Sequence, residues 1–100
     1  MDTLRLAKIF KALSHPNRLE LYLEIVRKHK ASFQTGCDCF VSDIIGSLNI
    51  GAPTISHHLK ELANAGLIVT ERRGKFLVAI INEESIDEVR EFLTHRHTSV

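Results

Sequence analysis

The 100-residue chain lacks several features that would place it in common protein classes. It has only two cysteines, one residue apart, and these do not make the disulfide framework of a small secreted domain. It contains no run of about 18 apolar residues, so we expect no membrane span. Its amphipathic N-terminus has no apolar signal-peptide core. Together these absences predict a cytoplasmic protein that does not bind a membrane.

The motifs of common enzyme active sites are also absent. The sequence has no glycine-rich phosphate loop, no nucleophile elbow and no His-Glu-x-x-His metalloprotease motif. A chain of this length supports one domain with one core, which leaves little room for a substrate pocket. We therefore expect a single domain over residues 1–100 that is not an enzyme.

The net charge of +1 does not by itself indicate a nucleic-acid partner, but the charges are unevenly distributed. Acidic residues gather between Glu83 and Glu91, whereas Arg72, Arg73 and Lys75 lie close together in the middle of the chain. The local distribution of charge matters more for partner choice than its sum. The basic cluster is therefore a candidate contact for DNA phosphates.

The stretch 53–66 has the clearest helical pattern in the chain. The apolar positions that recur there at helical spacing are Ile55, Leu59 and Leu62. Pro53 is tolerated only in the first turn of a helix, where its missing N–H costs nothing. Gly51 is a candidate N-cap and Gly66 a candidate C-terminal stop, so this helix has a predicted start, buried face and end.

The opposite face of this helix is polar and rich in hydrogen-bonding groups. Such a face suits a helix whose N-terminal half enters the DNA major groove. The residues expected to contact DNA from this helix are Thr54, Ser56, His57 and Lys60. We expect His58, at the edge of the apolar stripe, to be a half-buried packing residue. Arg18 is expected either to reach a phosphate or to form an intramolecular ion pair.

Apolar periodicity predicts two helices at the start of the chain. The first has Asp2 or Thr3 as its N-cap and is broken by residues 14–16. The second opens at the proline of that break and runs to about His29, and its apolar residues on two sides predict a central position. Residues 28–36 have no period and are predicted to form a loop.

A third helix and a hairpin are predicted on either side of the stretch 53–66. The third helix carries Val41 and Ile44 on its buried face. After Gly66, residues 67–71 and 76–81 are β-branched and extended, and residues 72–75 supply a turn. Asn82 then resembles the N-cap of a last helix, because acidic residues follow it and suit the helix dipole.

These elements predict a mainly α protein with a β-hairpin wing, in the α+β class. The expected order is helix, helix, helix, helix, strand, strand, helix, which is a winged helix-turn-helix. The basic hairpin residues Arg72, Arg73 and Lys75 are expected to meet phosphates or the minor groove, and to make DNA affinity salt-dependent.

The chain resembles the ArsR/SmtB family of small bacterial winged-helix repressors. The segments that carry the resemblance are ALSHPNRL at 12–19, PTISHHLKEL at 53–62, AGLI at 65–68 and RRG at 72–74. The resemblance implies a homodimer that binds a roughly palindromic operator in double-stranded DNA and releases it when an effector binds. One departure is that Gly51 and Ala52 stand where family members often have Ser-Gln, so a glutamine that could read adenine is lost.

The same resemblance implies that the first and last helices form the dimer interface. The apolar residues expected there are Leu6, Phe10, Leu13, Ile86, Val89 and Leu93. The family's metal site on the last helix lacks its first histidine in this sequence, so we expect that site to be absent.

Cys37 and Cys39 are the candidate sensor. Metal-sensing relatives carry a Cys-x-Cys that runs directly into Asp-Leu; residues 43–44 match Asp-Leu here, but Phe40 and Ser42 hold the cysteine positions. The actual pair lies three residues upstream. Two thiolates one residue apart can still reach one soft metal or metalloid ion, which would need a third ligand; no other cofactor is expected.

Three interpretations of this cysteine pair stay open, namely metal or metalloid sensing, thiol oxidation and no sensing role.

The function of the protein likewise has alternatives. The chain is predicted to be a DNA-binding repressor released by an effector at Cys37 and Cys39. It could instead be a repressor with no small effector, or a winged-helix module that binds proteins and no DNA.

Overall fold

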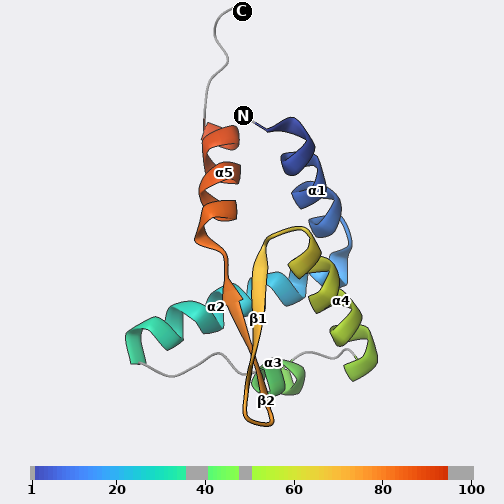
Figure 1. Cartoon of the computed structure of the whole chain (residues 1–100), viewed down its shortest axis with the longest axis vertical. Helices are drawn as coiled ribbons and strands as arrows, with labels where there is room; N and C mark the ends of the chain where they lie inside the picture. The colour runs from blue at the N-terminus through green and yellow to red at the C-terminus, as the bar shows by residue number, and fades with distance from the viewer. Residues whose placement is uncertain (1, 36–40, 48–50, 95–100) are drawn as a thin grey trace, which may run out of the picture.

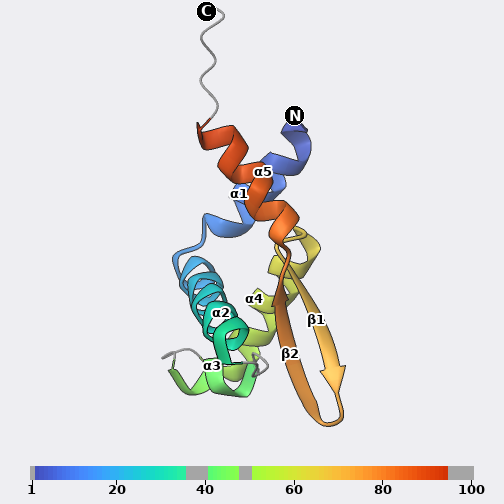
Figure 2. The same ribbon diagram turned by 90° about the vertical axis from the view of Figure 1, so that its left-hand side faces the viewer.

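The computed structural model describes residues 2–35, 41–47 and 51–94 of the chain. In chain order the elements are α1 (Thr3–Leu13), α2 (Pro16–Thr35), α3 (Val41–Ser47), α4 (Ala52–Asn64), β1 (Ile68–Arg73), β2 (Phe76–Ile81) and α5 (Glu83–Thr94). This order is the predicted one, and the architecture is a winged helix-turn-helix. Figures 1 and 2 show α1 and α5 at one end of the molecule and the hairpin projecting from the other.

Helix α1 begins as the sequence predicts. The side chain of Asp2 accepts a hydrogen bond from the backbone N–H of Arg5 at 3.1 Å, so Asp2 is the N-cap. At its C-terminus the Ser14 hydroxyl donates to the carbonyl of Lys11 at 2.7 Å. Pro16 then opens α2 as its first residue, where its fixed φ is preorganised for a helix.

Helix α2 is longer than predicted. It continues to Thr35, so the predicted loop over residues 28–36 is wrong for all but its last residue, which lies outside the described part of the chain. The absence of an apolar period does not by itself break a helix. No glycine or proline occurs between Pro16 and Gly36, and lysine, alanine and glutamine are good helix formers. The helix propensity of these residues therefore extends α2 beyond its last regularly spaced apolar positions.

The core forms where α2 packs against α4, the wing and α3. The largest fully buried side chains include Leu21 and Ile25 of α2, Ile44 of α3, Ile55 and Leu62 of α4, and Leu67, Ile68 and Val78 near the hairpin. The central position predicted for α2 is thus confirmed. One of the two apolar sides predicted for α2 is only partly buried by the rest of the protomer, since its Leu19 and Leu23 are 38% and 47% exposed.

The wing is a two-stranded antiparallel hairpin. Its register pairs Ile68 with Ile81 and Arg73 with Phe76, so β1 extends two residues beyond its predicted end. The turn is therefore shorter than predicted, and Arg72 and Arg73 lie in the strand. Gly74 has φ +63°, a conformation that glycine adopts without a steric penalty. No helix in the described part of the chain is long and apolar enough to cross a bilayer.

Candidate DNA-binding surface

Helix α4 separates a buried face from a polar one, as predicted. Gly51 is the N-cap in an extended conformation, and Pro53 lies in the first turn. Ile55, Leu59 and Leu62 are at most 4% exposed and attach the helix to the core. The residues predicted to contact DNA, Thr54, Ser56, His57 and Lys60, are all exposed on the other face. The helix therefore offers hydroxyl, imidazole and ammonium groups to a partner.

The C-terminus of α4 is a sharp, hydrogen-bonded stop. Gly66 has φ +78°, its N–H donates to the carbonyl of Ala63, and the N–H of Leu67 donates to the carbonyl of Leu62 at 3.0 Å. This pair of hydrogen bonds is the Schellman motif, which satisfies the last carbonyls of a helix. The chain therefore turns at once from α4 into β1, and the wing is fixed close to the polar helix.

The wing presents the predicted basic residues. Arg72, Arg73 and Lys75 are exposed, and the Lys75 ammonium lies 5.6 Å from the centre of the Phe76 ring. The Nε of Arg73 lies 3.5 Å from an Oε of Glu71, so this arginine has an acidic neighbour. The hairpin thus carries cations that can meet phosphate groups.

Helix α4 and the hairpin border one shared recess of about 240 Å³. Ser56, Lys60 and Asn64 line it from α4, and Thr70 and Leu77 line it from the two strands. Two predicted contact residues of the helix therefore lie beside the base of the wing. Figure 2 shows the ribbon of α4 next to the hairpin. A DNA duplex that met the polar face of α4 could also be reached by the wing.

His58 lies deeper than predicted. Its side chain is buried, being 4% exposed, and neither ring nitrogen has a hydrogen-bond partner. The rings of His15 and His57 are centred 4.9 Å and 6.0 Å away. Burial lowers the pKa of His58, and electrostatic interactions with His15, Arg18 and His57 lower it further. The lowered pKa favours the neutral imidazole of His58, which is buried next to the exposed His57 on α4.

Arg18 forms the intramolecular ion pair. Its guanidinium lies 3.8 Å from an oxygen of Glu61, which joins α2 to α4. The side chain is 15% exposed, and its Nε is buried without a hydrogen-bond partner. Sequence reasoning did not identify Glu61 as the partner, because spacing along one helix does not show which residue of another helix it faces.

The residues predicted for a dimer interface lie on α1 and α5 with unequal exposure. Leu6 is 5% exposed and packs inside the protomer, so it lies beneath this surface. Phe10 and Leu93 are 37% and 68% exposed, and Leu4, which was not among the predicted residues, is 75% exposed. Leu13, Ile86 and Val89 are partly buried and line an apolar cavity of about 350 Å³ with Leu93.

The two helices are held together within the protomer. The Phe10 and Phe92 rings are centred 5.6 Å apart, and an Nη of Arg5 lies 3.1 Å from a carboxylate oxygen of Glu88. The helices therefore form one unit whose outer side exposes large apolar side chains.

The candidate sensor residues Cys37 and Cys39 lie outside the described residues. Within residues 2–35, 41–47 and 51–94, no three histidine, cysteine or acidic side chains are grouped closely enough to hold a metal ion. The metal or metalloid ion suggested for these cysteines therefore stays a prediction from the sequence.

Comparison with known proteins agrees with this geometry. A model of the family described as "Bacterial regulatory protein, arsR family" matches residues 36–70, which include α4 and the start of the wing. An arsenical resistance operon repressor of Staphylococcus xylosus is 31% identical over 99% of this chain and 86% of its own. The transcriptional repressor SdpR of Bacillus subtilis is 33% identical over 85% of this chain and 89% of its own.

A solved structure shares the fold. The homodimeric winged helix-turn-helix DNA-binding domain of a possible ArsR-family regulator from Mycobacterium bovis superposes with a TM-score of 0.63. It is 22% identical and covers 96% of this chain and 88% of its own. With a polar helix and a basic wing on one side of this fold, and with relatives of this identity over nearly its whole length, the chain belongs to the ArsR family of winged-helix, DNA-binding transcriptional repressors.

Proposed function

We propose that the protein is a homodimeric repressor that reads a palindromic operator with α4 and contacts the flanking phosphates with its wing. The observation that carries this proposal is the shared surface of α4 and the hairpin, where Ser56 and Lys60 lie beside the strands. Thr54, Ser56, His57 and Lys60 would contact bases or phosphates in the major groove. Arg72, Arg73 and Lys75 would supply a salt-dependent part of the affinity.

The homodimer is supported by the apolar surface of α1 and α5. Leu4 and Leu93 are among the most exposed large apolar residues of the described chain, and an exposed apolar patch of this kind often marks an interface. The M. bovis relative is described as homodimeric. Two copies joined here would hold two α4 helices for two half-sites about one helical turn apart.

The effector is proposed from the sequence and from the relatives. Cys37 and Cys39 would bind a soft metal or metalloid ion, or would be oxidised, and either event would lower operator affinity. Two relatives are named for arsenical and cadmium resistance, respectively. A change of this kind is typically worth about 1–3 kcal/mol of coupling between effector and DNA.

The deciding experiment is a fluorescence-anisotropy titration of the reduced protein with DNA from its own upstream region. It is repeated with Zn(II), Cd(II), As(III), Cu(I) and a mild oxidant, for the native chain and for a Cys37→Ser/Cys39→Ser variant. Release by one ion that the variant abolishes would support a metal sensor. Release by oxidant alone would support a thiol switch.

Two other results would change the proposal. Tight DNA binding that no ion or oxidant relieves would favour a repressor without a small effector. No binding at any salt concentration would favour a winged-helix module that binds a protein partner, and it would reject the operator model.

A further inference from the structure

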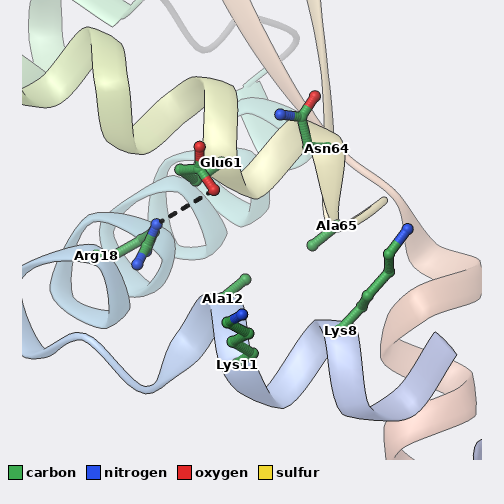
Figure 3. A pocket seen from close by; sticks show the side chains of 7 residues that line it. All are labelled: Lys8, Lys11, Ala12, Arg18, Glu61, Asn64 and Ala65. Carbon is green, nitrogen blue, oxygen red and sulfur yellow. Dashed lines mark ion pairs between the residues drawn. The ribbon is translucent and has the colours of Figure 1, made fainter. Parts of the chain in front are cut away.

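Three positively charged side chains line a second recess, although the net charge of the chain is only +1. Figure 3 shows it between α1, α2 and α4, with Lys8 and Lys11 on the first helix and Arg18 on the second. Glu61 of α4 is the one acidic residue among its described lining. The lining therefore has an excess of positive charge, and none of the proposed DNA contacts belongs to it.

Arg18 has hydrogen-bonding capacity that its ion pair does not use. Its distance of 3.8 Å from Glu61 is longer than a charge-assisted hydrogen bond. Its Nε is buried and has no partner. A guanidinium has five N–H donors in a fixed plane and binds phosphate oxygens in pairs. Because the Nε is buried, a tetrahedral anion in the recess would bind the Nη donors beside Glu61 instead.

The other lining residues suit the same ligand. Lys8 and Lys11 are three residues apart, so they share one face of α1. Asn64 adds a neutral amide from α4, and Ala12 and Ala65 leave space because their side chains are small. Figure 3 shows the long Lys8 side chain extending toward the C-terminal end of α4. Lys8 points away from Arg18 in this view, so both flexible lysine side chains would have to rotate to bring their ammonium groups to an anion held by Arg18.

The size of the recess suits a small ligand. Its volume is about 260 Å³, which at roughly 30 Å³ per water molecule equals on the order of nine waters. This space fits a phosphate group joined to a few carbon atoms. It is small for a nucleotide with its base and sugar.

We propose that this recess binds the phosphate group of a small free anion, held by Arg18, Lys8 and Lys11. Binding would draw the guanidinium away from Glu61 and so release an ion pair between α2 and α4. The inference goes beyond the proposed function, because it involves neither the cysteines nor the DNA contacts. It can therefore hold or fail independently of operator binding.

The test is an NMR titration of the uniformly 15N-labelled full chain with glycerol 3-phosphate and, separately, with inorganic phosphate. The control is potassium chloride at equal ionic strength. We expect saturable amide shifts centred on Lys8, Lys11 and Arg18 that chloride does not produce. Lys8→Gln and Lys11→Gln should each weaken binding about fivefold or more, whereas Lys28→Gln, with the same loss of charge outside the recess, should not.

A further variant tests the arginine without removing its charge. Arg18→Lys keeps one positive charge but loses the planar pair of donors, so binding should weaken while the amide spectrum stays that of a folded chain. A 20-base-pair duplex separates the two sources of phosphate. Shifts of the recess amides with duplex and none with either small anion would overturn the proposal, as would equal shifts with chloride or an unchanged affinity in the lysine variants.

Discussion

The side-chain amide of Asn82 donates a hydrogen bond to the backbone carbonyl of Gly66 at 2.8 Å. Gly66 ends the turn after α4, and Asn82 is the N-cap of α5, where its side-chain oxygen accepts from the N–H of Glu84 at 3.2 Å. The Ser85 hydroxyl donates to the same carbonyl. One asparagine thus joins the end of the helix proposed to read DNA to the start of a helix proposed to form the dimer.

Replacing this asparagine should separate its two roles. Asn82→Ala loses both the cap and the link, and we expect the free energy of unfolding to fall by about 1–2 kcal/mol. Asn82→Asp keeps an oxygen that caps α5 but has no amide to donate to Gly66. Urea unfolding should therefore give Asn82→Asp an intermediate stability. If the aspartate variant were as stable as the native chain, the link to Gly66 would contribute nothing.

The wing should contribute a salt-dependent, sequence-independent part of DNA affinity. Lys75→Gln or Arg72→Gln removes one cation, so affinity should fall by similar factors on every sequence. The slope of log affinity against log salt should decrease by about 1 for each variant. Lys28→Gln on α2 is the matched control. An unchanged slope in both wing variants would remove the wing from the contact surface.

The exposed face of α4 should determine sequence preference. Thr54→Ala and His57→Ala remove hydrogen-bonding groups, and we expect losses of about 1–3 kcal/mol at particular base pairs. Binding to a library of operator variants measures this effect position by position. A uniform loss over all positions would mean that these side chains contact phosphates instead of bases.

The dimer proposal predicts a clear effect at Leu93. This residue is 68% exposed in the protomer, so Leu93→Asp should leave the monomer folded but place an unpaired charge in the proposed interface. Sedimentation equilibrium should then show a monomer. Leu23→Asp, at a position 47% exposed on α2, serves as the control and should stay dimeric. A dimeric Leu93→Asp protein would contradict the assigned interface.

Stability should depend on pH through His58. Its pKa is lowered from 6.5 in the folded protein, first by burial and then by His15, Arg18 and His57. The stability that comes from its neutral form is therefore complete above about pH 6.5 and decreases as the pH falls through 6.5 toward the lower folded value. The slope contributed by one such group is at most about 1.4 kcal/mol per pH unit. His58→Leu should remove this contribution, whereas His29→Leu should not.

Much of this fold follows from local sequence signals. The prolines at 16 and 53 restrict the backbone, whereas the glycines at 66 and 74 adopt positive φ angles that other residues rarely adopt. The elements begin or turn at or next to these four residues. The apolar spacing of α4 identified its buried face, and therefore also its polar face. These signals act within one element, which is why residues that share the exposed face of α4 could be predicted.

Relationships between elements could not be predicted in the same way. The pairing of Arg18 with Glu61 depends on how α2 and α4 cross, and that of Asn82 with Gly66 on the register of the hairpin. No spacing within one element reports either relationship. The depth of His58 also depends on other parts of the chain, because His15, which precedes α2, lies against a position at the edge of the apolar stripe. The end of α2 was misplaced for a different reason, since apolar periodicity reports burial more directly than backbone conformation.

The hairpin has a consequence for the protein before it meets DNA. In the described part of the chain, β1 and β2 pair only with each other, so no described strand covers the outer edge of either one. Open edges invite pairing with strands of other molecules, and charged side chains discourage it. Glu71, Arg72 and Arg73 lie in β1. The charges proposed to hold DNA would thus also keep free copies of the repressor from aggregating through their wings.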